Sequence, residues 1–419
     1  MNLSFKELSG STRLFLDYLF DYPQLSEFFS GDFSRLDSYR GIAEQVGKNR
    51  YPRAELAALL TDQNREFGAT SRTLENINLL KDSRTNVVFT GQQIGLFGGP
   101  LYTIYKSLTL IKLAGKLESE LKTKVIPIFW MATDDHDFVE INHIFFSDRQ
   151  DKLVKLEYQP EKNWSGCPAS QIILDKNILA TLEILRSGLK SAKFTQPVLE
   201  KLSDAYQPGR PYHLAFARWM TLLLGKFGLI ILNPADPRFK TLLKPIFKSE
   251  LEMDGNLQKL IEQTSRILES KNYHRQVRRK DNLTNLFYHS PHRVNVTKEN
   301  GSFGWQGNDR KLSGPEIIKI LDQTPQNFSA NVLLRPVLES FLFPNLAHVA
   351  GPSEIAYFAQ TKSLHEEFRV TMPVVYPRRS LTLIEPEVKE TLARYNVLLP
   401  ELNRDVEAVY SRLIEAKLP

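Results

Sequence analysis

Ionisable side chains concentrate in one short stretch, where three aspartates surround one histidine and a glutamate and a second histidine follow. They are Asp134, Asp135, His136, Asp137, Glu140 and His143. A histidine titrates near neutral pH, and neighbouring carboxylates tune its charge. Such a group can perform general acid–base catalysis on an amine or a hydroxyl, or position a polar substrate.

Two other interpretations of this cluster compete with acid–base chemistry. His136 with Glu140, and Glu140 with His143, have helical i,i+4 and i,i+3 spacing, which suits a metal ion. Aspartates also cap helices. Three acids beside a histidine exceed what capping needs, and no further metal ligand is evident. We therefore expect Asp135, His136 and Asp137 to be catalytic, and we expect no metal.

A glycine-rich segment, TGQQIGLFGGPLYTIYKS, begins at Thr90 and precedes the cluster. Its glycines let the backbone approach a ligand closely, and Gln92 and Gln93 offer side-chain amides. The segment contains neither G-x-G-x-x-G nor a P-loop. Free N–H groups at the helix start after Pro100, with Lys106 two turns in, nevertheless favour an anion. The alternative is a tight turn with Lys106 in solvent, but the shared sheet edge with the acidic cluster favours ligand binding.

A second Gly-Pro pair and two arginines add possible anion ligands. Gly351-Pro352 lies where a strand gives way to a helix, as Gly99-Pro100 does. Gly-Pro is a common turn dipeptide, and the functional interpretation is two helix starts that face one cleft. Arg335 and Arg378 could bind a carboxylate or phosphate bidentately. Apolar residues flank Arg335, so burial and structural pairing are an equal alternative for it.

These side chains need a scaffold that brings strand ends together. Short apolar runs occur at residues 86–90, 125–131, 229–232, 346–350 and 370–376. Helical patterns separate the runs, which predicts an α/β fold with a doubly wound parallel sheet. In such sheets ligands sit beyond the carboxyl ends of the strands. We therefore expect the glycine-rich segment and the acidic cluster at the same edge.

The rest of the chain surrounds this core. The predicted parts are a helical N-terminal cover, 1–82; a core, 83–385, with inserted subdomains at about 144–206 and 238–343; and the start of a coiled-coil arm, 386–419. The arm is predicted from a heptad stripe that begins at Val388 and needs a partner helix. Pro400 cannot lie in a helix interior without cost, so it begins a second helix. The basic run 274–280 can bind phosphate or an acidic surface, but a solvated helix face is the favoured interpretation.

Composition limits the class of protein. The chain has 54 Lys and Arg against 48 Asp and Glu, a mild excess that permits anionic ligands. No basic stretch interleaves with aromatic residues as a nucleic-acid platform requires. No apolar run approaches the roughly 18 residues of a membrane span, and the N-terminus lacks a signal-peptide pattern. The single cysteine, Cys167, fits a reducing compartment. We expect a cytoplasmic protein that binds neither nucleic acid nor membrane.

Five segments resemble, in the same order, the bacillithiol biosynthesis cysteine-adding enzymes, a family of cysteine ligases. They are TGQQIGLFGGPLYTIYKS, PIFWMATDDHDFVEINH, NVLLRPVLES, HVAGPSEIAYFAQTKSLHEEF and MPVVYPRRS. The resemblance implies a Rossmann-like nucleotide-binding core with two connecting insertions, related in shape to class I aminoacyl-tRNA synthetases. It also implies a coiled-coil arm used in homodimerisation. Family members continue past the arm, so we expect this chain to lack the usual C-terminal segment.

The resemblance also implies an activity and a set of site residues. The activity is the last step of bacillithiol biosynthesis, in which L-cysteine is joined to glucosaminyl malate through an amide bond, with ATP or another nucleotide as cosubstrate. The motif residues carried over are Thr90, Gly91, Gln92, Gln93, Gly98, Gly99, Pro100, Asp135, His136, Asp137, Gly351, Pro352 and Glu354. Lys106, Arg335 and Arg378 complete the predicted binding set.

Two other functions remain compatible with the same sequence. A nucleotidyltransferase would use the cleft only to activate a small carboxylate, and carboxylate-dependent pyrophosphate exchange would reveal it. A non-catalytic interaction protein would keep the fold and dimerise through its coiled coil. A stable dimer with no ligand-induced rise in melting temperature would identify that case.

Overall fold

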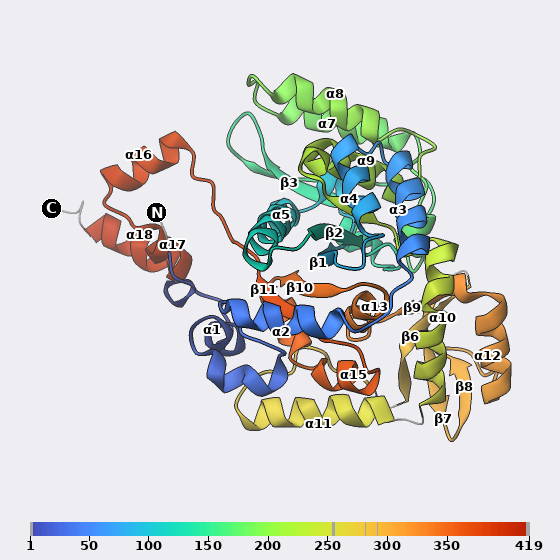
Figure 1. Cartoon of the computed structure of the whole chain (residues 1–419). Coiled ribbons are helices and arrows are strands. Elements are labelled where there is room, and N and C mark those ends of the chain that lie inside the picture. Colours follow the sequence, from blue (N-terminus) through green and yellow to red (C-terminus); the bar gives the residue numbers. More distant parts are fainter. Residues whose placement is uncertain (1–2, 254–255, 281, 291, 416–419) are drawn as a thin grey trace.

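The computed structural model describes residues 3–253, 256–280, 282–290 and 292–415 (Figure 1). Residues 1–2 of the predicted cover and 416–419 of the predicted arm lie outside the described residues. Residues 254–255, 281 and 291 of the second predicted insertion do so as well. The boundaries of these parts remain a prediction.

A parallel sheet of five strands forms the centre of the molecule, in the order β11-β10-β1-β2-β5. The strands are β1 (Asn86–Gln92), β2 (Val125–Met131), β5 (Ile230–Leu232), β10 (Asn345–Ala350) and β11 (Val374–Pro377). Each predicted apolar run contributes one strand, so the mixed α/β fold with a parallel sheet is confirmed. The chain adds β2 and β5 on one side of β1, then returns to add β10 and β11 on the other.

The sheet is buried on both faces, as continuous apolar strands require. Val87 and Phe89 of β1 belong to one hydrophobic core, while Val88 between them belongs to the other. This alternation follows from the strand geometry, in which successive side chains point to opposite faces.

Helices from separate parts of the chain cover each face. The core that contains Val87 includes side chains of α1 (Arg13–Phe20), α3 (Arg53–Glu66), α4 (Ser71–Leu79), α10 (Pro237–Glu252), α11 (Asn256–Ser270), α12 (Gly314–Gln323), α13 (Arg335–Leu342), α14 (Pro352–Phe358) and α15 (Lys362–Glu367). The core that contains Val88 includes side chains of α2 (Leu36–Val46), α5 (Leu101–Leu121), α6 (Phe138–Ile141), α7 (Asn177–Gly188), α8 (Thr195–Ala205) and α9 (Tyr212–Leu224). Within the described ranges, no helix is both long and apolar enough to cross a membrane.

Two antiparallel sheets lie within the predicted insertions. β3 (His143–Ser147) and β4 (Leu153–Glu157) form a hairpin. β8 (Ser302–Trp305), β7 (Arg293–Glu299), β6 (Leu283–His289) and β9 (Phe328–Ala330) form a four-stranded sheet in that order. In Figure 1 this sheet and α12 lie at the lower right, on the opposite side of the molecule from the C-terminal helices.

The C-terminal segment differs from the predicted arm. Its described residues form three short helices, α16 (Pro386–Arg394), α17 (Leu399–Arg404) and α18 (Val406–Glu415), where two were predicted. Asn396 adopts a positive φ of 49° and Asp405 is extended, so the helix stops twice. Pro400 does lie in the first turn of α17, as predicted. A coiled coil is therefore not formed within the described part of the chain.

Candidate functional site

A cleft of about 820 Å³ opens at the carboxyl ends of β1, β2 and β10. Because the strand order reverses between β1 and β10, this edge is the topological switch point at which open α/β sheets bind ligands. Predicted site residues line the cleft at the ends of two of these strands. They are Gly91 and Gln92 at the end of β1, and Gly351 and Pro352 after β10. The cleft volume falls within the range of small-molecule sites.

Lys106 lies at the base of the cleft on α5 and is only 1% exposed. Its Nζ donates to the carbonyl oxygen of Gly91 at 2.5 Å and to Oε1 of Gln92 at 3.1 Å. Nζ also lies 2.6 Å from Oε2 of Glu354. Burial lowers the pKa of Lys106, while Glu354 opposes that shift. The alternative that placed Lys106 in solvent is therefore wrong.

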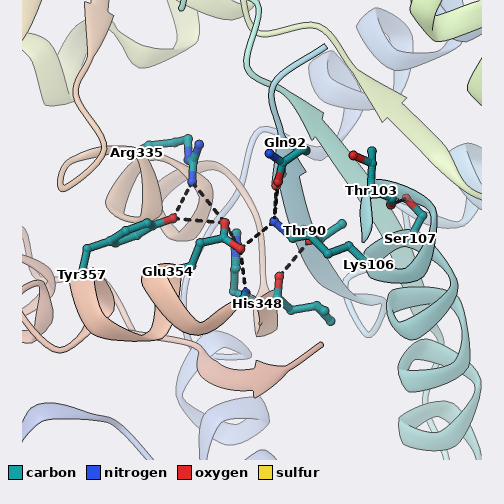
Figure 2. Close-up of polar contacts among 12 residues, drawn as sticks. Thr90, Gln92, Thr103, Lys106, Ser107, Arg335, His348, Glu354 and Tyr357 are labelled. Carbon is teal, nitrogen blue, oxygen red and sulfur yellow. Dashed lines mark hydrogen bonds and ion pairs between the residues drawn. The ribbon is translucent and has the colours of Figure 1, made fainter. Parts of the chain in front are cut away.

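Glu354 connects Lys106 to a second cation. Its Oε2 accepts the N–H of Gly351 at 2.8 Å, and its Oε1 lies 3.9 Å from Nη2 of Arg335. Arg335 donates from the same nitrogen to the hydroxyl of Tyr357 at 2.6 Å (Figure 2). Burial alone would raise the pKa of Glu354, but the neighbouring cations and the Gly351 N–H hold it below its usual value. Structural pairing of Arg335 is thus confirmed.

Two fully buried residues extend this network and were not singled out from the sequence. Nδ1 of His348 on β10 lies 2.8 Å from Oε2 of Glu339 on α13, and both residues are 0% exposed. Nε2 of His348 lies 4.0 Å from Oε1 of Glu354. We call Lys106, Arg335, Glu339, His348, Glu354 and Tyr357 the buried ion cluster. The apolar context of Glu339 in NVLLRPVLES was the only sequence sign of its burial.

Asp135 stands on the opposite wall of the cleft, after β2. Its Oδ2 accepts from Nε2 of Gln93 at 2.7 Å, and its Oδ1 accepts from Nη1 of Arg293 at 3.3 Å. Burial alone would raise the pKa of Asp135, but contacts with His136, Arg293 and Gln93 hold it well below its usual range. Asp135 is therefore a fixed anion at neutral pH. Arg293 begins β7 of the antiparallel sheet, and nothing in the sequence marks it as a partner of Asp135.

His136 contacts the same arginine. Nη1 of Arg293 lies 3.3 Å from Nδ1 of His136, whose side chain is 40% exposed. The same Nδ1 lies 3.6 Å from Oδ1 of Asp135, so His136 and Asp135 share the arginine as a neighbour. The Arg293 guanidinium also stacks 3.7 Å from the Phe287 ring centroid. We call Gln93, Asp135, His136 and Arg293 the Arg293 clamp.

A buried lysine pairs with the first aspartate of the acidic run. Nζ of Lys240 on α10 lies 2.6 Å from Oδ2 of Asp134, and both residues line the cleft. Lys240 is 1% exposed, and burial lowers its pKa. The sequence offered no signal for this pair, because Lys240 lies more than a hundred residues away in a helix of ordinary amphipathic pattern.

Several predicted site residues do not line the cleft. Thr90 is fully buried, and its hydroxyl donates to the carbonyl oxygen of Val349, which joins β1 to β10. Gly98, Gly99 and Pro100 form the turn before α5, outside the lining. Pro100 was predicted as the first helical residue and is instead the N-cap of α5, which begins at Leu101. These residues shape the scaffold beneath the cleft, so only one of the two Gly-Pro pairs faces it.

The two residues after Asp135 also lie outside the lining. His136 reaches the site through Arg293, whereas Asp137 is exposed at the N-terminus of α6. Arg378 does line the cleft, where its guanidinium donates to Oγ of Ser380 at 3.0 Å and lies over the Tyr102 ring.

The basic run 274–280 is not the solvated helix face that was favoured. α11 ends at Ser270, and the run continues as an extended loop. Val277, Arg278, Arg279 and Lys280 line the cleft. The many charges and few apolar residues of the run suggested a solvated helix. They could not reveal that this loop crosses the carboxyl edge of the sheet.

The cleft is positive overall. Eight of its lining residues are Lys or Arg, and three are Asp or Glu. This balance favours an anionic ligand. Among the described residues, no group of three or more His, Cys, Asp or Glu side chains could hold a metal ion.

Comparison with known proteins gives a consistent result. Residues 1–379 match the family model described as "Bacillithiol biosynthesis BshC, N-terminal Rossmann-like domain". A protein of Salinibacter ruber named "Putative cysteine ligase BshC" is 34% identical over 406 residues, which span 96% of this chain and 73% of the relative. Proteins of the same name from Natranaerobius thermophilus and Chlorobium phaeobacteroides are 33% and 35% identical, covering 94% and 91% of this chain and 73% and 69% of theirs.

The match covers the parallel-sheet core and every residue of the cleft described above. The identities extend over most of both chains. The chain therefore belongs to the bacillithiol biosynthesis BshC family.

Proposed function

We propose that this protein is a cysteine ligase that joins L-cysteine to glucosaminyl malate and so completes bacillithiol. The observation that carries the proposal is a positive cleft at the switch point of a Rossmann-like sheet, in a chain whose relatives are named cysteine ligases. The malyl part of the substrate carries two carboxylates, which suit a cleft rich in cations.

The Arg293 clamp suits the amine side of the reaction. Amide formation requires the uncharged amine, whose nitrogen attacks the activated cysteine carboxyl carbon. The activating group leaves as an anion, and the proton lost from the nitrogen passes to it or to water. Asp135 stays ionised, so it is a weak base, but its carboxylate can accept a hydrogen bond from the amine and orient it. His136 would donate a ring N–H toward an oxygen of the reacting carboxyl. Arg293 holds both groups in place.

A nucleotide cosubstrate, with ATP as our choice, would activate the cysteine carboxyl. The chain lacks both standard phosphate fingerprints, so any phosphate contact must come from individual cations. The surplus of Lys and Arg in the lining supports such contacts. The nucleotide supplies the leaving group, and the chain's own residues bind and orient the two substrates.

The test is direct. Purified protein is incubated with cysteine, glucosaminyl malate and ATP, and the product is identified by mass spectrometry. We expect bacillithiol from the wild type and about 100-fold less from His136→Ala. Absence of product from wild-type protein that binds glucosaminyl malate, or equal product from the variant, would refute the assigned roles. Cysteine-dependent pyrophosphate exchange without ligation would identify a nucleotidyltransferase instead.

We further propose that the C-terminal helices take part in a homodimer and that the protein is cytoplasmic. Exposed apolar side chains on α16 and α18 support the dimer, including Val388, Val406 and Tyr410. Light scattering of wild-type protein and of Val406→Ser/Tyr410→Ser tests it. A monomeric wild type at micromolar concentration would contradict this part of the proposal.

A further inference from the structure

Most cations of the cleft are already paired within the protein. Lys106 contacts Glu354, Lys240 contacts Asp134, and Arg293 contacts Asp135. Arg335 contacts Tyr357 and Glu354, and Arg378 contacts Ser380 and the Tyr102 ring. Four of these five cations lie beside a carboxylate of the chain itself, and Arg378 contacts neutral groups.

The loop 274–280, which we call the strap, is different. Arg278 and Lys280 are exposed, line the cleft, and have no side-chain hydrogen bond or ion pair with any residue that the structure describes. Two cations that face a cleft without a protein partner are available to an anionic ligand.

The strap is firmly anchored by its alternate residues. Arg275 pairs with Glu262 at 2.6 Å and with Glu269 at 3.0 Å. The N–H of Val277 donates to Oε1 of Gln360 at 2.9 Å, and its carbonyl oxygen accepts from Nε2 of the same side chain at 3.1 Å. Gln360 is fully buried.

Arg279 provides the third anchor. Its guanidinium donates to Oδ1 of Asn285 and to the carbonyl oxygen of Thr284 on β6. Burial lowers the pKa of Arg279 to about 10, so it remains charged at neutral pH. These three anchors hold the loop in place, and its two exposed cations, Arg278 and Lys280, line the cleft.

From this arrangement we infer that the strap is an oligophosphate-binding element, in which Arg278 and Lys280 bind the phosphates of a nucleoside di- or triphosphate. The inference deepens the proposed function, on which it rests for the place of a nucleotide in the reaction. The strap faces the switch-point edge, where nucleotide phosphates bind in open α/β sheets. Two exposed cations in the lining of the cleft suit an extended phosphate chain.

The anchored backbone strengthens this binding. A flexible basic loop would lose conformational entropy when it closes on a ligand. The contacts of Arg275, Val277 and Arg279 order the strap before binding, so less affinity is lost.

Binding measurements test the inference without turnover. Calorimetry compares ATP, inorganic tripolyphosphate and L-malate on the wild type and on Arg278→Ala/Lys280→Ala. The matched control is Lys48→Ala/Arg50→Ala, which removes the same residue types at the same spacing from an exposed site outside the cleft. We expect the strap variant to bind ATP and tripolyphosphate at least about tenfold more weakly. Malate binding and the control variant should be unchanged.

Four outcomes would overturn the inference. These are unchanged phosphate affinity in the strap variant, an equal loss in the control, a loss confined to malate, and no phosphate binding by the wild type. Since neither altered side chain has a partner among the described residues, melting temperatures within a few degrees of wild type are expected, and they exclude unfolding as the cause. If the protein ligates cysteine but the strap variant binds phosphates and ligates as well as wild type, this inference alone is wrong. If phosphate binding depends on the strap but no ligation occurs, the proposed function alone is wrong.

Discussion

The buried ion cluster and the Arg293 clamp face each other across one cleft, but they are built differently. The ion cluster takes all its members from elements of the parallel-sheet core, and Lys106, Glu339 and His348 are almost completely buried. The clamp joins the loops after β1 and β2 to β7 of the antiparallel sheet, and the His136 side chain is 40% exposed. The first arrangement fixes charges as part of the fold. The second sets polar groups at a boundary where a substrate can reach them.

This contrast predicts that ion-cluster variants lose stability and that clamp variants lose activity. The largest effect is expected for Glu354→Ala. The substitution leaves the Lys106 charge buried without its carboxylate, which costs about 3–5 kcal/mol of unfolding free energy. Urea denaturation measures the loss. The double variant Lys106→Met/Glu354→Gln should recover most of it, because the buried Lys106 charge is gone and Arg335 keeps Glu339 at 3.9 Å. A loss of unfolding free energy below about 1 kcal/mol in Glu354→Ala would contradict the structural role of the ion cluster.

For the clamp, Arg293→Met should reduce kcat/KM for ligation about 100-fold, since Asp135 and His136 lose their common support. Arg293→Lys should not restore activity, because an ammonium cannot reproduce the planar fork and its stacking on Phe287. Arg310→Met, on an exposed loop of the same region, is the control. Retained activity in Arg293→Met would show that the clamp is structural.

The pH dependence of the unfolding free energy distinguishes ionised Asp135 from the neutral side chain of Asp135→Asn. The folded-state pKa of Asp135 lies below the unfolded value, so its stabilising effect is present above the unfolded pKa and is lost as pH falls through the folded one. Unfolding free energies of wild type and Asp135→Asn should therefore differ most at neutral pH. The difference should shrink below about pH 4. A difference independent of pH would mean that Asp135 is not an ion in the folded protein.

The smallest effect is expected for the turn beneath the ion cluster. Gly98 has a φ of +100°, and an added Cβ would lie 3.0 Å from Nε1 of Trp219. Gly98→Ala should cost about 1–3 kcal/mol in urea denaturation while KM changes little. Gly115→Ala, in open space within α5, should instead stabilise the protein by about 0.5–1 kcal/mol. If the rise in KM of Gly98→Ala, expressed as a free energy, exceeds its loss of unfolding free energy, the turn belongs to the binding site.

Much of the core could be predicted because its signals are local. The apolar runs that became β1 and β2 are continuous, and Gly228 and Gly351 lie at strand or helix boundaries where glycine is expected. The C-terminal heptad stripe did not predict the number of helices, for the same local reason. Apolar spacing alone does not register the positive φ of Asn396 or the extended Asp405 that interrupt the helix.

The candidate site was predictable only in part. Sequence motifs identified Asp135 and Glu354, but not Arg293, Lys240 or His348, which contact them or their neighbours. These partners lie in segments whose sequence patterns are those of ordinary strands and helices. Their pairing depends on which side chains the fold buries together, and a lone Arg or Lys in a sequence carries no sign of its partner.

The sequence by itself determined the parallel α/β core, the chemistry of the residues at its carboxyl edge, and the resemblance to cysteine-adding enzymes, because each follows from residue types at short spacing. Only the tertiary structure decided that Lys106 is buried against Glu354, that Arg293 holds Asp135 and His136, and that the strap faces the cleft. Those facts arise from contacts between residues far apart in the chain, because a buried charge is stable only when a partner is buried beside it.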